Sequence, residues 1–398
     1  MVLLSPRSVG LNPRDHLPWP VVHGAAAVMF AAFGAAYAIV MFFPQIGAEL
    51  AIPAWMLTLL FSLAGGLYYL VGAVSGWLTD RYGARPVVRA GMGVLASGLA
   101  AASMARGPWS FALTYVMGVG IGVGLAYVPS SAAVQLHSGE HGALAGGIAS
   151  SGIGVGTMLV PPACMLLIGW IGWRPAMGSL AALMLLGVLG SRPFRLTRAH
   201  GPLARRRSED IASVRFMLLY LAYVCVGLTA FVPIADMVPY ITSKGLPGQD
   251  AGSMLALIGS GSILGRFGFG YLADHVGARR ASVQCAVLLS VSFVIMAVRT
   301  EAIPLFAAAL LFGLSYGGMT GLTAATAAEV MGVAHFGGTL GTLMTSRAVG
   351  ILFGPWCVVL GAEALGAYTA PYALCAALAL AAAWMLHLER APLPTQTP

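Results

Sequence analysis

Twelve apolar stretches, most of them at least about twenty residues long, constrain this chain more than any other feature of its sequence. They run at residues 20–44, 54–78, 86–105, 109–136, 142–170, 174–191, 215–242, 251–273, 281–298, 303–328, 337–361 and 367–387. A helix needs about 20 apolar residues to cross a hydrocarbon core about 30 Å thick. The sequence lacks the alternation of apolar and polar residues that is typical of barrel strands. We therefore predict an all-α integral membrane protein with twelve transmembrane helices.

The composition supports a lipid environment. Only 9% of the residues are charged and the mean hydropathy is +0.86, whereas soluble domains carry about 25% charged residues. This excludes a soluble enzyme, a disordered chain and a nucleic-acid-binding module, so we expect a lipid bilayer and no nucleic acid as partner. The five cysteines lie within apolar stretches without paired spacing, so we interpret them as small buried apolar residues. We expect no metal and no cofactor.

The longest polar interruption, residues 191–215, divides the spans into six and six. We predict an N-terminal tail (1–19), a first six-helix bundle (20–191), a linker (192–214), a second bundle (215–388) and a C-terminal tail (389–398). The tails and the even-numbered loops carry fifteen arginines, and the odd-numbered loops carry only Arg106, Arg174, Lys244 and Arg299. By the positive-inside rule, both termini and the linker are cytoplasmic, which places the chain in the cytoplasmic membrane.

The two halves of the sequence repeat one unit. The segment from Gly76 to Arg85, GWLTDRYGAR, returns as GYLADHVGAR from Gly270, at an offset of 194 residues. The same offset relates Gly147 to Gly341, as it does for further positions of the fifth and eleventh spans. Three separate segments that share one offset indicate an internal duplication of the kind found in transporters with parallel repeats.

The pattern G-x3-D-R-x-G-x-R resembles the signature of the major facilitator superfamily, and the resemblance covers essentially the whole chain. It implies two pseudo-symmetric six-helix bundles around a central cavity that opens alternately to each side of the membrane. We expect the protein to be a monomer. The acids of the motif can accept hydrogen bonds at the start of a neighbouring helix, and its arginines are expected to pair across the bundle interface. The resulting cytoplasmic gate is predicted at Gly76, Asp80, Arg81, Gly83, Arg85, Gly270, Asp274, Gly277 and Arg279. The alternative is that these are only positive-inside loop charges.

Two arginines lie inside predicted spans. Arg266 precedes Asp274 by eight residues, and Arg347 follows Gly337 by ten, which places both about 12–15 Å from the cytoplasmic end. An arginine at that depth costs at least about 2.5 kcal/mol on insertion scales, so each should face a wet or paired interior.

Asp236 is the only carboxylate within a span, and its position 21 residues beyond Arg215 puts it near the outer end of the seventh helix. The chamber therefore carries about two uncompensated positive charges, which an anionic substrate with a carboxylate would balance. This net charge favours a dicarboxylate or an exchange of carboxylates, and a monocarboxylate fits if one arginine is satisfied within the protein. The alternative is that an arginine is structural and bonded to backbone carbonyls.

Segments around these arginines are similar to the monocarboxylate transporter and oxalate/formate antiporter branch. They include LAGGIASSGIGVG from Leu144, Gly265-Arg266, and MTSRA around Arg347. The resemblance implies that Arg266 engages a substrate carboxylate and that Arg347 supplies a second basic group. The chain departs from animal monocarboxylate transporters at Tyr37, where they carry a lysine, and at Ser262, where they carry an aspartate. The usual protonatable partner is therefore missing, and Asp236 and His23 are the substitute candidates for proton coupling.

Three tyrosines complete the predicted chamber, because a hydroxyl facing lipid would be unsatisfied. They are Tyr37, Tyr127 and Tyr316, for which helix packing is the alternative. We predict a transporter of small organic mono- or dicarboxylates that works by alternating access, by symport, antiport or facilitated transport, and not an enzyme. The substrate carboxylate is predicted to bridge Arg266 and Arg347, with Tyr37 and Tyr127 closing from the first bundle. The alternative is a drug exporter of the same fold with structural arginines. That class would usually need a mid-membrane acid.

Overall fold

The structure, a computed structural model, describes residues 18–194, 213–235, 237–247, 250–333 and 336–388. Within these ranges every regular element is a helix. Twelve of the helical segments are long and apolar enough to cross a membrane, which confirms the number of spans predicted from the sequence. The predicted tails and most of the linker lie outside the described residues, so their boundaries stay predictions.

The first bundle contains six long helices. Its elements are α1 (Trp19–Ala38), the 3₁₀ turn η1 (Ile39–Phe42), α2 (Phe43–Leu50), α3 (Ala54–Tyr82), α4 (Ala84–Ser103), α5 (Pro108–His137), the turn η2 (Gly139–His141), α6 (Gly142–Ile171) and α7 (Trp173–Gly190). The first predicted span thus continues through η1 and α2, where Pro44 lies at the start of α2. Proline is tolerated there because the first turn of a helix leaves its N–H groups without a helical partner.

The second bundle repeats this arrangement. Its elements are α9 (Val214–Ala230), α10 (Val232–Ala235), α11 (Met237–Ser243), α12 (Asp250–Val276), α13 (Ala278–Val298), α14 (Ala302–Met331), α15 (Phe336–Leu365) and α16 (Thr369–Leu388). The seventh span was predicted as one stretch, residues 215–242, but the helix is interrupted at Phe231, between α9 and α10; residue 236, between α10 and α11, lies outside the described residues. Pro233, in the first turn of α10, explains this interruption, because proline removes a backbone donor and crowds the preceding turn.

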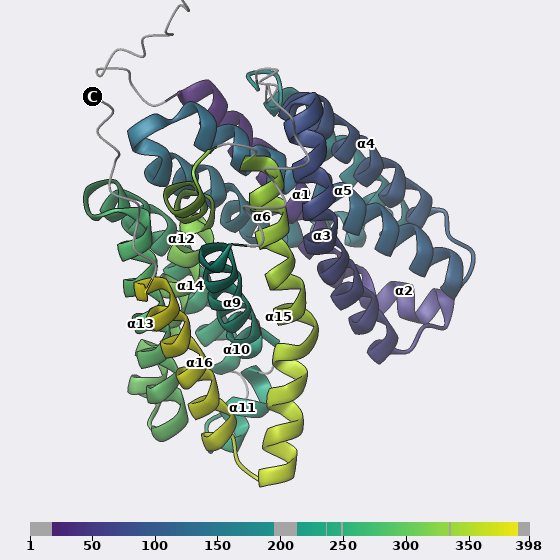
Figure 1. The fold of residues 1–398 in the computed structure, drawn as a ribbon. Helices are drawn as coiled ribbons and strands as arrows, with labels where there is room; N and C mark the ends of the chain where they lie inside the picture. The colour runs from purple at the N-terminus through teal and green to yellow at the C-terminus, as the bar shows by residue number, and fades with distance from the viewer. Residues whose placement is uncertain (1–17, 195–212, 236, 248–249, 334–335, 389–398) are drawn as a thin grey trace, which may run out of the picture.

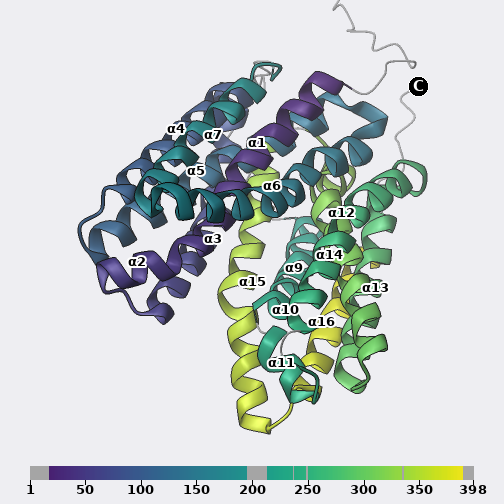
Figure 2. The same ribbon diagram turned by 180° about the vertical axis from the view of Figure 1, so that it is seen from behind.

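The two bundles meet mainly along two helix pairs, α3 with α15 and α6 with α12, and α14 also contacts α6. The offset of 194 residues that relates α6 to α15 also relates α3 to α12, so the two pairs are equivalent by the repeat. Figures 1 and 2 show the bundles side by side, with α2 and α11 far apart at their lower ends. We call the end of the molecule that holds Asp80 and Asp274 the motif end, and the other end the α2/α11 end.

Glycines allow the backbones to touch at both helix pairs. A Cβ at Gly76 would overlap the carbonyl oxygen of Gly337, and a Cβ at Gly147 would overlap the carbonyl oxygen of Arg266. The turns that follow α3 and α12 also need glycine, because Gly83 and Gly277 have φ angles of 85° and 94°. The repeated motif therefore sets both a tight turn and a close helix contact in each half.

The outer surface of the bundles is apolar. Trp170, Trp384 and Ile303 are 78%, 64% and 83% exposed, as expected of side chains that face hydrocarbon. Cys357 is also exposed on this surface, which corrects the interpretation of all five cysteines as buried. Three of the others are fully buried and Cys225 is half-buried.

Candidate functional site

A cavity of about 590 Å³ lies between the two bundles on the α2/α11 side of Arg266. The first bundle contributes residues of α1 and α6 to its walls, and the second bundle contributes residues of α10, α12 and α14. The part of α12 that lines it runs from Leu255 to Arg266, the half of the helix away from Asp274. Known small-molecule sites have volumes of about 300–1,000 Å³, so the cavity is large enough for a metabolite.

Arg266 lies at the inner end of this cavity and is 4% exposed. Its Nη1 donates to the hydroxyl oxygen of Ser262 at 2.6 Å and to the carbonyl oxygen of Ser262 at 3.2 Å. Its buried Nε has no hydrogen-bond partner among the described residues. A guanidinium group carries five N–H donors, so Arg266 retains donors that its own helix does not use.

Arg347 is 5% exposed and is held within the second bundle. Its Nη2 donates to the hydroxyl of Thr323 on α14 at 2.7 Å. Its guanidinium carbon lies 5.9 Å from the ring centroid of Tyr223 on α9, within the range of a cation–π contact. Among the described residues no carboxylate forms an ion pair with Arg347 or with Arg266. The two guanidinium groups also lie close enough to interact electrostatically.

The structure brings two of the predicted tyrosines to the cavity. Tyr37 of α1 and Tyr316 of α14 line it together with Arg266. Tyr316 also lines a second space of only about 10 Å³, and Arg347 lines this space as well. A space of that size holds about one water. Tyr316 therefore forms a shared wall, with Arg266 on its open side and Arg347 on its closed side.

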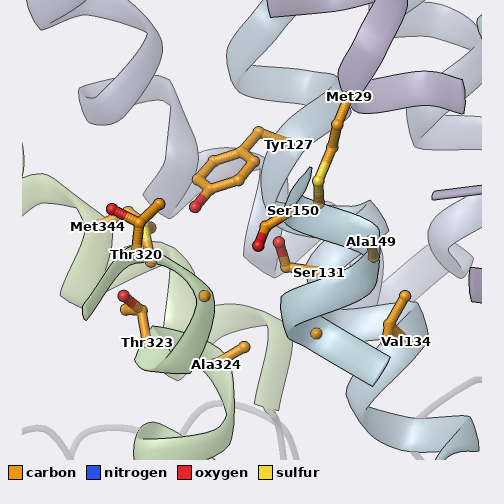
Figure 3. Close-up of a pocket in the computed structure, with 12 residues that line it drawn as sticks. Met29, Tyr127, Ser131, Val134, Ala149, Ser150, Thr320, Thr323, Ala324 and Met344 are labelled. Carbon is orange, nitrogen blue, oxygen red and sulfur yellow. The ribbon is translucent and has the colours of Figure 1, made fainter. Parts of the chain in front are cut away.

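Tyr127 lies in a third space, again of about 10 Å³, at the bundle interface. In Figure 3 it projects from the first bundle toward Thr320 of α14, with Ser150 of α6 beside it. Its hydroxyl is close enough to both arginines to interact electrostatically. The five predicted binding residues thus form one neighbourhood, but only Arg266, Tyr37 and Tyr316 reach the large cavity.

At the motif end, the two aspartates cap helices of the opposite bundle. Asp80 accepts from the backbone N–H groups of Gly337 and Gly338, at 2.9 Å and 2.7 Å, at the start of α15. Asp274 accepts from Ala143 and Leu144 at the start of α6, both at 3.2 Å and both through Oδ1. A helix start attracts anions because its N–H groups and its dipole both favour negative charge.

The motif arginines differ from the sequence expectation, in which they pair across the bundle interface. Arg279 donates to the carbonyl oxygens of Leu386 and His387 at the end of α16, within its own bundle. Arg81 lies over the rings of Trp77 and Tyr82 on its own helix. Because the backbone N–H groups of α6 and α15 already occupy the aspartates, the arginines bind elsewhere. The Nε of Arg85 is buried and has no partner among the described residues.

Asp236, the candidate coupling residue, lies outside the described residues. The sequence analysis missed Thr323, Tyr223 and Tyr69, which surround Arg347. Tyr69 and Tyr223 carry the same signal as the predicted tyrosines, a hydroxyl within an apolar span. Thr323 carries a weaker signal, because a threonine in a membrane helix usually bonds its own backbone, as Thr323 also does through the carbonyl oxygen of Met319.

Comparison with known proteins places this architecture in context. A family model described as "Major Facilitator Superfamily" matches residues 25–216 and 219–398. Monocarboxylate transporter 11 of Mus musculus is 27% identical over 407 residues, which cover 98% of this chain and 91% of that protein. Monocarboxylate transporter 3 of Rattus norvegicus is 28% identical over 373 residues, 88% of this chain and 75% of that protein. The crystal structure of the transporter FucP in the outward conformation superimposes with a TM-score of 0.76 at 12% identity, covering 93% of this chain and 98% of that chain.

Proposed function

The chain belongs to the major facilitator superfamily, and from that premise we propose that it carries small organic carboxylates across the cytoplasmic membrane by alternating access. It is a multi-pass membrane transporter rather than an enzyme. The substrate class, the residues that bind it and the cytoplasmic position of both termini belong to the proposal.

One observation carries the substrate class. Arg266 is buried at the end of a large cavity, and among the described residues it has no acidic partner and one unused buried donor. A buried cation without a counter-charge is costly, and a carboxylate that accepts two guanidinium hydrogen bonds offsets that cost. The names of the two similar monocarboxylate transporters agree with this choice of anion.

In this proposal Arg266 makes the direct contact, and Tyr37 and Tyr316 donate hydrogen bonds from the two bundles. Arg347 acts on the substrate mainly through its charge, since Thr323 and Tyr223 hold its guanidinium group behind Tyr316. The positive potential of the pair attracts the anion. Once the anion neutralises it, the two bundles can approach each other around the substrate.

Alternating access then requires the motif end to open. In the present conformation Asp80 and Asp274 join the bundles at that end, and the cavity lies on the other side of Arg266. Closure of the α2/α11 end around the substrate, together with release of the two aspartate contacts, would expose the same site to the cytoplasm. In this proposal, the present conformation is the one in which the site faces away from the cytoplasm.

Counterflow in proteoliposomes tests this function. Proteoliposomes that contain the purified chain are preloaded with unlabelled carboxylates and supplied from outside with a panel of labelled mono- and dicarboxylates. We expect accumulation of at least one labelled carboxylate, abolished by Arg266→Gln and strongly reduced by Arg347→Gln. Arg299→Gln, at an exposed position on the loop after α13, is the matched control and should transport normally. Unchanged counterflow in Arg266→Gln would remove that residue from the site, and carboxylate-independent efflux of cationic drugs would support the exporter alternative instead.

A further inference from the structure

Fifteen of the described residues line the large cavity, and Arg266 is the only charged one among them. Arg347 does not line the cavity, because Tyr316 stands between the cavity and the small space around Arg347. Among the described residues, a substrate with two carboxylates that enters this cavity therefore meets one cation. Its second carboxylate would have no charged partner.

The rest of the wall is mainly apolar. Six large apolar side chains line it, from α6, α10 and α12: Ile153, Met158, Ile234, Leu255, Ile258 and Ile263. The polar groups are few and some are already committed, since Ser262 accepts from Arg266 and Thr157 donates to its own helix. A carboxylate pressed against such a wall would lose its hydration without compensation. An apolar group placed there would instead gain stability from burial.

We propose that this wall is an apolar subsite, and that the substrate is a monocarboxylate with an apolar body of several carbons or an aromatic ring. The inference rests on the proposed function, in which Arg266 holds the carboxylate, and it narrows the substrate class. The carboxylate lies at Arg266, and the apolar body extends along α12 past Ile258 toward Leu255. The two buried charges alone would favour a dicarboxylate, but only one of them reaches the space in which the substrate can lie.

Chain length and the number of carboxylates give the first test. The full chain, purified in detergent, is heated with butanoate, hexanoate, phenylacetate, succinate or adipate, and its thermal stabilisation is converted to a dissociation constant. Each buried methylene should tighten binding about fourfold, so hexanoate should bind about 15-fold more tightly than butanoate. Adipate should bind more weakly than hexanoate. Stabilisation by hexanoate should vanish in Arg266→Gln, which controls for non-specific insertion of the acid into the detergent micelle.

Gly259 offers a gain-of-function test. It lines the cavity two helical turns before Arg266, about 10.5 Å along α12, and a Cβ there would meet no atom within 4 Å. Gly259→Lys should supply the missing second cation and make adipate bind at least tenfold more tightly than in the original chain. Gly259→Met, a neutral side chain of similar length, should leave the preference for hexanoate in place.

The outcomes separate the two proposals. If adipate or succinate binds the original chain as tightly as the monocarboxylate of equal length, or if affinity does not rise with chain length, the apolar subsite is wrong and the carboxylate carrier stands. If Gly259→Lys gains no affinity for adipate although hexanoate still binds, the assigned path along α12 is wrong. If no acid of either series stabilises the original chain, the proposed function itself fails, and the subsite with it.

Discussion

The two aspartate caps at the motif end should contribute unequally to keeping that end closed. Asp80 uses both carboxylate oxygens, at 2.9 Å and 2.7 Å, whereas Asp274 uses one oxygen for two longer bonds of 3.2 Å and its other oxygen lies 3.7 Å from His141 Nδ1. Charged hydrogen bonds of the shorter length contribute about 1.5–3 kcal/mol each. Asp80→Asn keeps one acceptor oxygen and removes the charge that the start of α15 attracts.

From these contacts we expect Asp80→Asn to cost the closed motif end about 2 kcal/mol, which changes the equilibrium between the two conformations about 30-fold. Asp274→Asn should cost about 1 kcal/mol, a change of about fivefold, because its bonds are longer and share one oxygen. Asp80→Asn should therefore shift the equilibrium between the two conformations more than Asp274→Asn does.

The distance between two spin labels, measured by double electron–electron resonance, would check this. Met104 and Ile303 are 76% and 83% exposed and lie on different bundles, at the helix ends away from the motif end. The labels are attached at these two positions in a chain whose accessible Cys225 and Cys357 are replaced by alanine. The two labels should move closer to each other as the motif end opens. Glu363→Gln removes an exposed acid from α15 and should leave the distances unchanged. The reasoning is refuted if Asp80→Asn does not shorten the label distance, or if Asp274→Asn has the larger effect.

Two further predictions concern helix packing and buried hydroxyls. Gly76→Val should separate α3 from α15 and lower the melting temperature, because a side chain there overlaps the carbonyl oxygen of Gly337, whereas Gly93→Val meets open space and should change it little. Tyr240→Phe should cost about 1 kcal/mol of stability, because its buried hydroxyl donates to the carbonyl oxygen of Met296 at 2.7 Å. Tyr115→Phe should be neutral or stabilising, because that hydroxyl is buried without a partner among the described residues, and equal losses in the two variants would contradict this.

Much of the fold could be predicted from the sequence because lipid imposes simple requirements. A span needs an apolar stretch of fixed length, and the repeat from Gly76 and from Gly270 reports the duplication directly. The interruption of the seventh span at Phe231 was missed, although Pro233 lies two residues beyond it. Proline inside a membrane helix is common enough that its presence alone does not indicate a break.

The candidate site could be predicted only in part. The sequence identifies Arg266 and Arg347 as buried cations, because charge within a span has few explanations. It does not show that Tyr316 stands between them, since that depends on how α14 packs against α12 and α15. It also does not show where the motif arginines bind. The partners of Arg279 are carbonyl oxygens at the end of α16, and any residue type can supply a carbonyl.

The contact between Gly147 and Arg266 has a mechanical consequence. The side chain of Arg266 lines the cavity, while its main-chain oxygen touches α6 of the other bundle at Gly147. If Arg266 binds the substrate as proposed, the same residue also forms part of the contact at which the two bundles would move against each other. In that case a small tilt of α12 on substrate binding would act on the contact between the bundles directly, without intervening side chains.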